Sequence, residues 1–202
     1  MAEPVIEVQK LYVAYFGRPA DPAGLEYWTD ALSNNAASLQ DISRSFAASM
    51  EYRETYTGMD NRAIVAEVYK NLFGREAETT GIDYWSGLMD QGVISIDDVV
   101  KDISKAAQGG DDVAFNGKVA AASMFTLRLD EPHETEAYAG SAALNLASEY
   151  VATVRDLETA IDAIKPEVVD AWIERIVATH PTGIDEVALV GVAPVQEPLP
   201  VY

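Results

Sequence analysis

The sequence predicts an all-α protein with two tandem three-helix repeats, a long-helix bundle segment after them, and an irregular tail. Three observations predict this class: the chain resembles itself at an offset of 57 residues, apolar side chains recur three and four positions apart, and no β-type alternation of useful length occurs up to Ile176. We expect a tandem repeat over 1–108 (copies about 5–57 and 62–108), a C-terminal helical segment packed on it over 109–179, and a proline-rich tail or linker over 180–202.

The first repeat contains signals for the start and end of three helices. Apolar residues from Val8 to Phe16 follow helical spacing, and Gly17 is placed to end that helix in the left-handed conformation. Asp21 followed by Pro22 reads as the N-cap and the first position of a second helix. The third helix is expected to follow Ser38 and to carry Leu39, Ile42, Phe46 and Met50.

The second repeat shows the same pattern, and the identities between the two copies stand in register. The shared pattern is Tyr-x3-Phe-Gly-Arg-x5-Gly-[Leu/Ile]-x-Tyr-Trp. A coincidence of this length predicts one structural unit used twice. Tyr12, Phe16, Gly17, Arg18, Ala20, Gly24, Tyr27 and Trp28 recur as Tyr69, Phe73, Gly74, Arg75, Ala77, Gly81, Tyr84 and Trp85.

The C-terminal segment is also helical in pattern but does not repeat. One helix is expected after the Gly109-Gly110-Asp111 break, and a final helix is expected to begin at Pro166. Between them, apolar residues from Leu144 to Ile164 step by three and four, which predicts a single long helix over about Glu136 to Ile164 with a bundle-type seam. The two flanking helices are expected to bury Phe115, Val119, Ala122 and Phe125, and Val169, Trp172, Ile173 and Ile176.

The composition excludes several classes of function. There are 14 Lys and Arg against 33 Asp and Glu, for a formal net charge of −19, and a field of that sign repels phosphate, so unaided nucleic-acid binding is not expected. The chain has no cysteine, and its two histidines, His133 and His180, do not stand beside other ligands at metal spacing. No apolar run approaches the ~20 residues of a membrane span, so no transmembrane insertion is expected.

The repeated pattern resembles a helical domain of unassigned function that is common in bacterial secreted proteins. Members of that family often sit beside RTX-type calcium-binding repeats, and their fold is similar to that of the phycobilisome linker domain. A diverged form resembles the N-terminal region by which some surface-layer proteins attach to the lipopolysaccharide O-antigen. The resemblance covers about Val5 to Ala107, twice over; the copies differ where Pro19 and Pro22 are replaced by Glu76 and Thr79.

The resemblance implies a non-enzymatic anchoring domain of an exported surface-layer or RTX-type protein, which binds envelope polysaccharide at the cell surface. The stretch from Met1 to Pro4 shows no secretory signal, so type I secretion is the expected route. Self-assembly is expected through other domains of a longer chain. The alternative is a protein–protein scaffold, whose partner helix would lie on the Leu144–Ile164 seam, and a third possibility is a bundle that binds a small ligand.

The candidate binding residues come from the repeated pattern, and each also has a structural interpretation. Tyr27 and Tyr84 would stack on a sugar or lie half-buried at the flank of their helix. Arg18 and Arg75 would recognise groups on a glycan or form forked pairs, the first with Asp21 or Glu26 and the second with Glu78 or Asp83. Trp28, Trp85, Phe16 and Phe73 are expected in the structural core.

Calcium is the one cofactor that the sequence suggests. Asp111 and Asp112 follow two glycines at a turn, and an extracellular carboxylate site of this kind takes calcium at millimolar strength, although no EF-hand or RTX pattern is present. No pair of carboxylates is marked as facing across a cleft, and no nucleotide-binding pattern appears. The sequence therefore predicts no catalytic residue.

Overall fold

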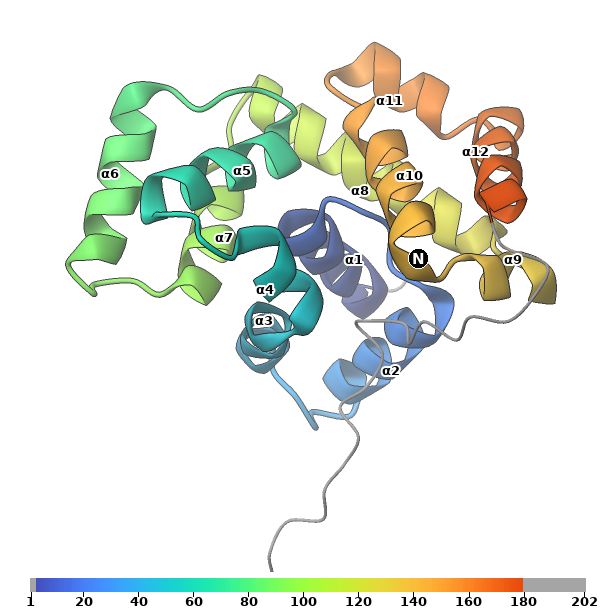
Figure 1. Cartoon of the computed structure of the whole chain (residues 1–202), viewed down its shortest axis with the longest axis horizontal. Helices are drawn as coiled ribbons and strands as arrows, with labels where there is room; N and C mark the ends of the chain where they lie inside the picture. Colours follow the sequence, from blue (N-terminus) through green and yellow to red (C-terminus); the bar gives the residue numbers. More distant parts are fainter. Residues whose placement is uncertain (1–2, 180–202) are drawn as a thin grey trace, which may run out of the picture.

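The computed structural model describes residues 3–179, and all the regular secondary structure in that range is α-helical (Figure 1). The prediction of an all-α fold is therefore confirmed. The expected tail over 180–202 lies outside the described residues. The helices are α1 (Glu3–Phe16), α2 (Pro22–Ser33), α3 (Leu39–Ala48), α4 (Met50–Tyr56), α5 (Asn61–Phe73), α6 (Thr79–Asp90), α7 (Ile96–Ala106), α8 (Gly110–Arg128), α9 (Pro132–Ala137), α10 (Gly140–Ala152), α11 (Leu157–Ala163) and α12 (Pro166–Thr179).

The start and stop signals of the first repeat act as the sequence predicts. Gly17 ends α1 with a left-handed φ of 64°, a conformation that glycine adopts without steric cost. The carboxylate of Asp21 accepts a hydrogen bond from the Gly24 backbone N–H and caps α2, whose first residue is Pro22. Ser38 starts α3 with a capping box.

The third helix of the first repeat is shorter than the sequence suggests. It ends at Ala48, and Ser49 adopts an extended conformation whose hydroxyl caps a separate helix, α4, at Tyr52. Met50, which we expected on the third helix, lies in α4 and is exposed. The serine ends α3 and begins α4 because its hydroxyl accepts a hydrogen bond from a backbone N–H that is otherwise free in the first turn of α4.

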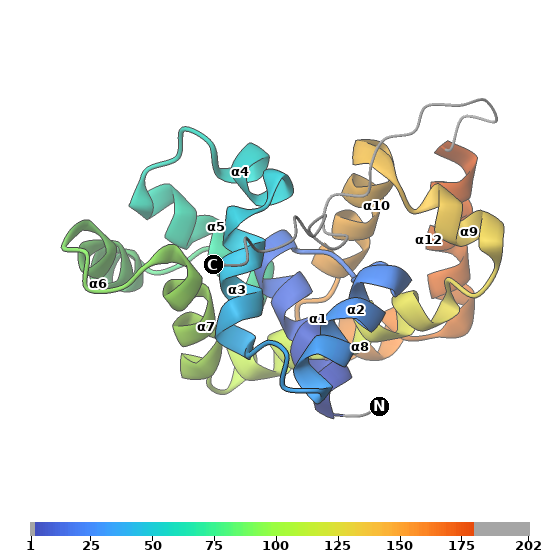
Figure 2. The same cartoon turned by 90° about the horizontal axis from the view of Figure 1, so that it is seen from below.

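The two repeats pack through equivalent helices, and the C-terminal segment completes their common core. Helix α1 packs on α5, α3 packs on α7, and α8 contacts both α1 and α5. The core residues of α1 and α5, among them Val8, Tyr12, Val65 and Leu72, are almost fully buried. Figures 1 and 2 show α8 running alongside α1, with α6 and α12 at opposite ends of the molecule.

The single long helix expected over Glu136 to Ile164 is wrong. The chain forms the end of α9, then α10, then α11. Gly140 has a φ of 80°, which a continuing helix does not accept, and the Asp156 side chain caps α11 at Thr159. The apolar seam is buried along α10, but beyond the break its residues turn outward: Leu157, Ile161 and Ile164 are exposed.

The first and last helices of the C-terminal segment form as expected. Helix α8 buries Phe115, Val119, Ala122 and Phe125, and α12 begins at Pro166. On α12, Val169, Ile173 and Ile176 are buried while Trp172 is partly buried against the core. Within residues 3–179, no helix combines the length and the apolar character that crossing a membrane requires.

Candidate functional site

The repeated Gly-Arg dipeptide builds a buried clamp. The Arg18 guanidinium lies 5.3 Å from the ring centroids of both Tyr12 and Phe16. Its Nε and Nη2 atoms donate to the two carboxylate oxygens of Glu51 at 2.5 and 2.7 Å, and Nη1 donates to the Pro19 carbonyl at 2.9 Å. Arg18 is 1% exposed. It therefore ties the α1–α2 loop to α4 from inside the protein.

The second repeat forms the equivalent clamp with its own arginine. Arg75 lies 5.6 and 5.9 Å from the ring centroids of Tyr69 and Phe73, and both its Nε and Nη2 donate to Asp111 at 2.7 Å. A further hydrogen bond joins Nη1 to Glu78 at 2.9 Å. The hydrogen bonds that Arg75 donates to Asp111 raise the pKa of Arg75 above its ordinary value. In each repeat the main partner lies on the helix that follows the third helix, which is α4 or α8.

The partners of these clamps differ from most of the expected ones. Arg18 pairs with Glu51, 33 residues away, instead of Asp21 or Glu26. Arg75 does use Glu78, but Asp83 pairs with Arg62 and the principal partner is Asp111. The expected type of bond is therefore confirmed and the identity of its partner is corrected. Local spacing along one helix could not reveal a carboxylate that the tertiary fold supplies.

The glycine and tyrosine of the motif pack directly against each other. A Cβ atom at Gly24 would lie 2.3 Å from the Tyr12 hydroxyl oxygen, closer than any two atoms can approach without movement. At the equivalent Gly81 the distance to the Tyr69 hydroxyl is 3.1 Å. The first and second helices of each repeat thus cross at a glycine. Only glycine fits at Gly24, and glycine fits most easily at Gly81.

The Tyr-Trp pair is repeated in geometry but not in burial. The rings of Tyr27 and Trp28 meet edge to face at 4.8 Å, and those of Tyr84 and Trp85 at 5.0 Å. Trp28 is buried against Phe46, whereas the second repeat has Ile103 at the position of Phe46, and Trp85 is only partly buried. Phe73 is buried and Phe16 is partly buried.

These contacts change the list of candidate glycan-binding residues. Arg18 is enclosed by protein, and the partly exposed Arg75 is already engaged by Asp111 and Glu78, so both guanidinium groups are occupied by contacts within the protein. Tyr27 is partly buried, and Tyr84 alone of the four is well exposed, at 60%. The recurring identities are thus accounted for by the architecture of the repeat, and binding determinants have to be sought at positions where the copies differ.

The candidate calcium ligands are engaged with other side chains. Both carboxylate oxygens of Asp111 accept hydrogen bonds from Arg75, and Asp112 accepts one from the Asn116 amide. Within residues 3–179, no group of three or more His, Asp or Glu side chains could together hold a metal ion. A calcium ion at Asp111 would have to displace the Arg75 guanidinium. Calcium binding stays an untested prediction, and this ion pair counts against it.

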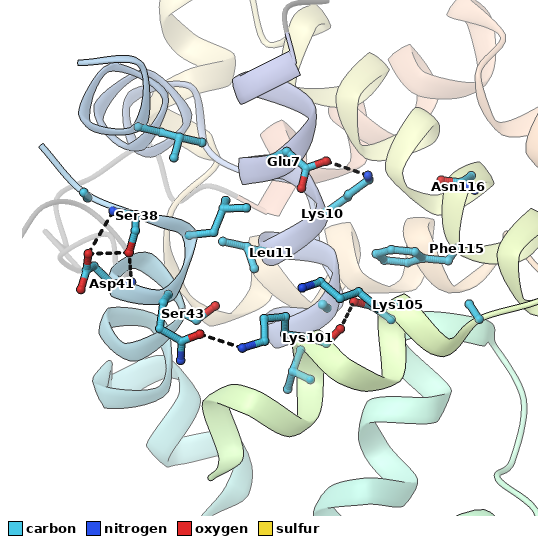
Figure 3. Close-up of a pocket in the computed structure, with 18 of the residues that line it drawn as sticks. Glu7, Lys10, Leu11, Ser38, Asp41, Ser43, Lys101, Lys105, Phe115 and Asn116 are labelled. Carbon is cyan, nitrogen blue, oxygen red and sulfur yellow. Dashed lines mark hydrogen bonds and ion pairs between the residues drawn. The ribbon is translucent and has the colours of Figure 1, made fainter. Parts of the chain in front are cut away.

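A groove lies where the two repeats meet. Its volume is about 910 Å³, and its walls come from α1, the 34–38 loop, α3, α7 and the start of α8 (Figure 3). Leu11, Leu32 and Leu39 provide apolar surface, and hydroxyl, amide and ammonium groups surround it. Those polar groups are on Asn35, Ser38, Gln40, Ser104, Lys105 and Asn116.

The charged groups of the groove are paired, with one exception. Lys10 binds Glu7 at 2.7 Å, and Lys101 binds Gln40 at 2.8 Å and Asp98 at 2.7 Å. The third lysine, Lys105, makes no hydrogen bond or ion pair with the residues described here. Figure 3 shows Lys101 and Lys105 reaching from α7 into the hollow.

The acidic groups that line the groove are each engaged. Glu7 holds Lys10, Asp112 accepts a hydrogen bond from Asn116, and Asp41 accepts from the Ser38 hydroxyl and backbone. These hydrogen bonds from Ser38 hold the pKa of Asp41 below its ordinary value. The groove can therefore offer donors to hydroxyl, carbonyl or anionic groups of a ligand.

The sequence alone does not reveal this groove. Its walls are brought together only when α3 packs on α7, and no single helix carries its pattern. A signal was nevertheless present: Asn35, Ser43, Ser104 and Lys105 stand where the other copy has a glycine, a valine and two alanines. Such differences in polarity between otherwise matching copies mark positions that the fold leaves open to function.

A second, smaller hollow of about 350 Å³ surrounds a buried lysine. The Lys118 ammonium donates to the carbonyl oxygens of Lys70 and Asn71 at 3.1 and 2.8 Å, at the C-terminal end of α5. Burial, helped by the positive charges of Arg155 and Lys70, lowers its pKa to about 8. The Lys118 ammonium therefore bonds to free carbonyl groups at the end of α5 and not to a carboxylate.

The fold and its clamps define a class: all-helical domains in which two three-helix repeats share one core. Within that class, the chain belongs to the family described as "Domain of unknown function (DUF4214)", whose model matches residues 8–56 and again 43–108, together half of the chain. No match was found among curated proteins or among solved structures.

Proposed function

We propose that this chain is a non-enzymatic, extracellular module that binds a polysaccharide of the cell envelope, such as the lipopolysaccharide O-antigen, and so anchors an exported surface-layer or RTX-type protein. The observation that carries the proposal is the groove between α3 and α7. It combines an apolar floor with amide, hydroxyl and ammonium groups, which suits a sugar, since a sugar presents both C–H faces and hydroxyls.

The position of the groove suits an anchoring role. Its walls belong to both repeats and to α8, and the clamps of Arg18 and Arg75 lie at the loops and helices that hold those elements in place. A site built on packed helices keeps its geometry under load better than one on a free loop. The exposed Tyr84 remains a further candidate contact, and Arg18 and Arg75 support the site from a distance.

The composition supports an exported protein by an independent argument. A formal charge of −19 keeps chains apart, and a chain without cysteine forms no cross-links during passage across an envelope. The groove offers three lysines in a protein with only 14 basic residues. Ligand recognition would thus be concentrated at the groove, while the acidic surface elsewhere repels other copies of the chain.

Calorimetric titration with purified lipopolysaccharide and with released O-antigen tests the function. Ala36→Trp would fill the groove from the exposed 34–38 loop, and Ala120→Trp, at an exposed alanine of α8 outside the groove, is the matched control. We expect binding by the parent and by Ala120→Trp, and no binding by Ala36→Trp. The absence of parent binding, with or without calcium, would overturn the proposal; equal binding by both variants would move the site elsewhere.

An assembly module is the second candidate, and one observation favours it. Leu157 and Ile161 on α11 and Ile164 at its C-cap form an exposed apolar stripe at helical spacing. The partner we would test is a second copy of this chain. Solution mass measured over a concentration series separates the candidates: a monomer that binds glycan supports anchoring, and an oligomer that ignores glycan and dissociates on Ile161→Glu supports assembly.

A further inference from the structure

A comparison of the two copies of the repeat shows which groove residues the fold requires, because both copies form the same helices. Where the copies share an identity, the residue forms a clamp, a helix end or a packing contact. At several positions of the groove wall the copies share the backbone location but differ in chemistry, and four of these pairs bear on the ligand. The pairs are Asn35 and Gly92, Ser43 and Val100, Ala47 and Ser104, and Ala48 and Lys105.

Asn35 occupies a backbone position that favours glycine. Its φ is 54°, and it is the one residue other than glycine with a positive φ among those described. The equivalent Gly92 has a φ of 66°. An asparagine in this conformation is held at some cost in free energy, and what it adds over glycine is an amide that lines the groove.

Ser43 carries a buried hydroxyl that the fold leaves unsatisfied. The residue lines the groove and is 1% exposed, and its Oγ has no hydrogen-bond partner among the described residues. The equivalent Val100 is fully buried, so an apolar side chain of similar size satisfies the packing there. A buried hydroxyl without a partner lowers stability, and a polar group of a ligand seated in the groove would relieve that cost.

Lys105 supplies the positive charge of the site. It projects from α7 into the groove, it is exposed, and the structure shows no ion pair for it among residues 3–179. The groove's acids are engaged elsewhere, as described above, so no neighbouring carboxylate neutralises it. The equivalent Ala48 shows that the helix does not need a lysine there.

We propose that the group seated in this groove is an acidic sugar, whose carboxylate or phosphate pairs with Lys105 while Ser43 and Asn35 offer hydrogen bonds to the same ligand. This inference rests on the proposed function and names the ligand class of the same site. The net charge of −19 limits how many negative charges the ligand can carry, because it repels a polyanion. A single acidic group close to an ammonium is still attracted at short range. Carboxylate and phosphate share the chemistry, and the probes below distinguish them.

The test compares three small probes on the full chain by titration under NMR: glucuronate, glucose 1-phosphate and glucose. We expect saturable shifts of groove signals, above all those of Asn35 and Lys105, with at least one acidic probe at millimolar concentration, and about tenfold weaker binding of glucose. Preference for glucuronate identifies a carboxylate, and preference for glucose 1-phosphate identifies a phosphate.

Three variants separate this role from a structural one. Lys105→Ala should remove the preference for the acidic probe, while Lys165→Ala, at a lysine on the surface outside the groove, should leave it unchanged. Ser43→Val and Asn35→Gly should weaken binding while the free energy of unfolding stays equal or rises, since the other repeat uses these residues. Weaker binding combined with lower stability in both variants would indicate a structural role instead.

The outcomes keep the two proposals apart. If glucose binds as well as the acidic probes, or if Lys105→Ala behaves like Lys165→Ala, the acidic-ligand inference is overturned and glycan binding stands. If no probe binds but lipopolysaccharide does, the inference is likewise overturned. If neither the probes nor lipopolysaccharide binds, both proposals are overturned.

Discussion

Arg18 and Glu51 form a two-pronged ion pair inside the first repeat, with hydrogen bonds of 2.5 and 2.7 Å and side chains that are 2% and 13% exposed. The corresponding pair of the second repeat, Arg75 and Asp111, is 37% and 24% exposed. The same covalent motif therefore produces a buried clamp in one copy and a half-exposed clamp in the other.

This difference in exposure predicts different costs of breaking the two clamps. Glu51→Gln leaves the buried Arg18 charge without its counter-ion, and we expect a loss of about 3–5 kcal/mol in the free energy of unfolding. Asp111→Asn leaves Arg75 in contact with water and Glu78, and we expect a loss of about 1 kcal/mol or less. Urea denaturation of both variants measures this; equal losses would contradict the assignment.

The two tryptophans of the repeat should also differ in importance. Trp28→Ala removes an indole that is buried against Phe46, and we expect a loss of about 3–5 kcal/mol. Trp85 is partly buried, and Trp85→Ala should cost roughly half as much. Thermal melting of both variants checks the order, and an equal decrease in Tm would show that the second repeat buries its indole as well as the first.

The contact between Tyr12 and Gly24 can be tested with a double-mutant cycle. Gly24→Ala places a Cβ 2.3 Å from the Tyr12 hydroxyl oxygen, and we expect a loss of about 1–3 kcal/mol. That hydroxyl has no hydrogen-bond partner among the described residues, so Tyr12→Phe makes room at little cost and should recover most of the loss. Gly81→Ala, at 3.1 Å from the Tyr69 hydroxyl, is the milder control.

Lys118 makes stability rise with pH above neutrality. Its folded-state pKa is about 8 against an ordinary value of 10.5, so between these values the unfolded chain binds more protons and a rise in pH favours the folded state. We expect a gain of about 2 kcal/mol between pH 7.5 and 9.5. Chemical denaturation at several pH values measures it, and Lys118→Met should flatten the profile; a parent profile that is already flat would contradict the shift.

Higher pH should reverse this gain. Burial raises the pKa values of Tyr12, Tyr56, Tyr138 and Tyr150 above the ordinary value of 10. Above pH 10, tyrosines of the unfolded chain release their protons while these stay protonated in the folded state, so the unfolded state is favoured.

Calcium should have little specific effect on stability. Because Arg75 occupies both oxygens of Asp111, we expect calcium chloride to raise Tm no more than sodium chloride of equal ionic strength, which screens the same charge repulsion. A larger rise that disappears in the Asp111→Asn, Asp112→Asn double variant would restore a calcium site at this turn.

The sequence predicts local structure well and misses what distant packing creates. Helix ends at Gly17, Asp21 and Ser38 depend on neighbouring residues and are confirmed. The prediction of a long helix is wrong because the apolar spacing continues past two local signals, Gly140 and Asp156, that end and restart the helix. Periodicity alone does not show whether a stripe such as Leu157 and Ile161 faces protein or water.

The candidate site was less accessible to prediction than the fold. The arginines and tyrosines are conspicuous in the sequence because they recur in both copies. Their recurrence reflects the packing and ion pairs that both repeats share. Glu51 and Asp111 could not be chosen as partners from spacing, since they approach their arginines only after α4 and α8 have packed. The groove residues are informative for the opposite reason, because they differ between the copies.

Two hydrogen bonds tie the loop after α1 to residues more than a hundred positions later. The Tyr138 hydroxyl donates to the Pro19 carbonyl at 2.7 Å, and the Thr126 hydroxyl donates to the Ala20 carbonyl at 2.7 Å. A chain synthesised at about 5–20 residues per second reaches Tyr138 roughly 6–24 seconds after Pro19. During that interval these two hydrogen bonds cannot form, so the loop is held only by contacts within the N-terminal half, such as the bond from Arg18 to the Pro19 carbonyl.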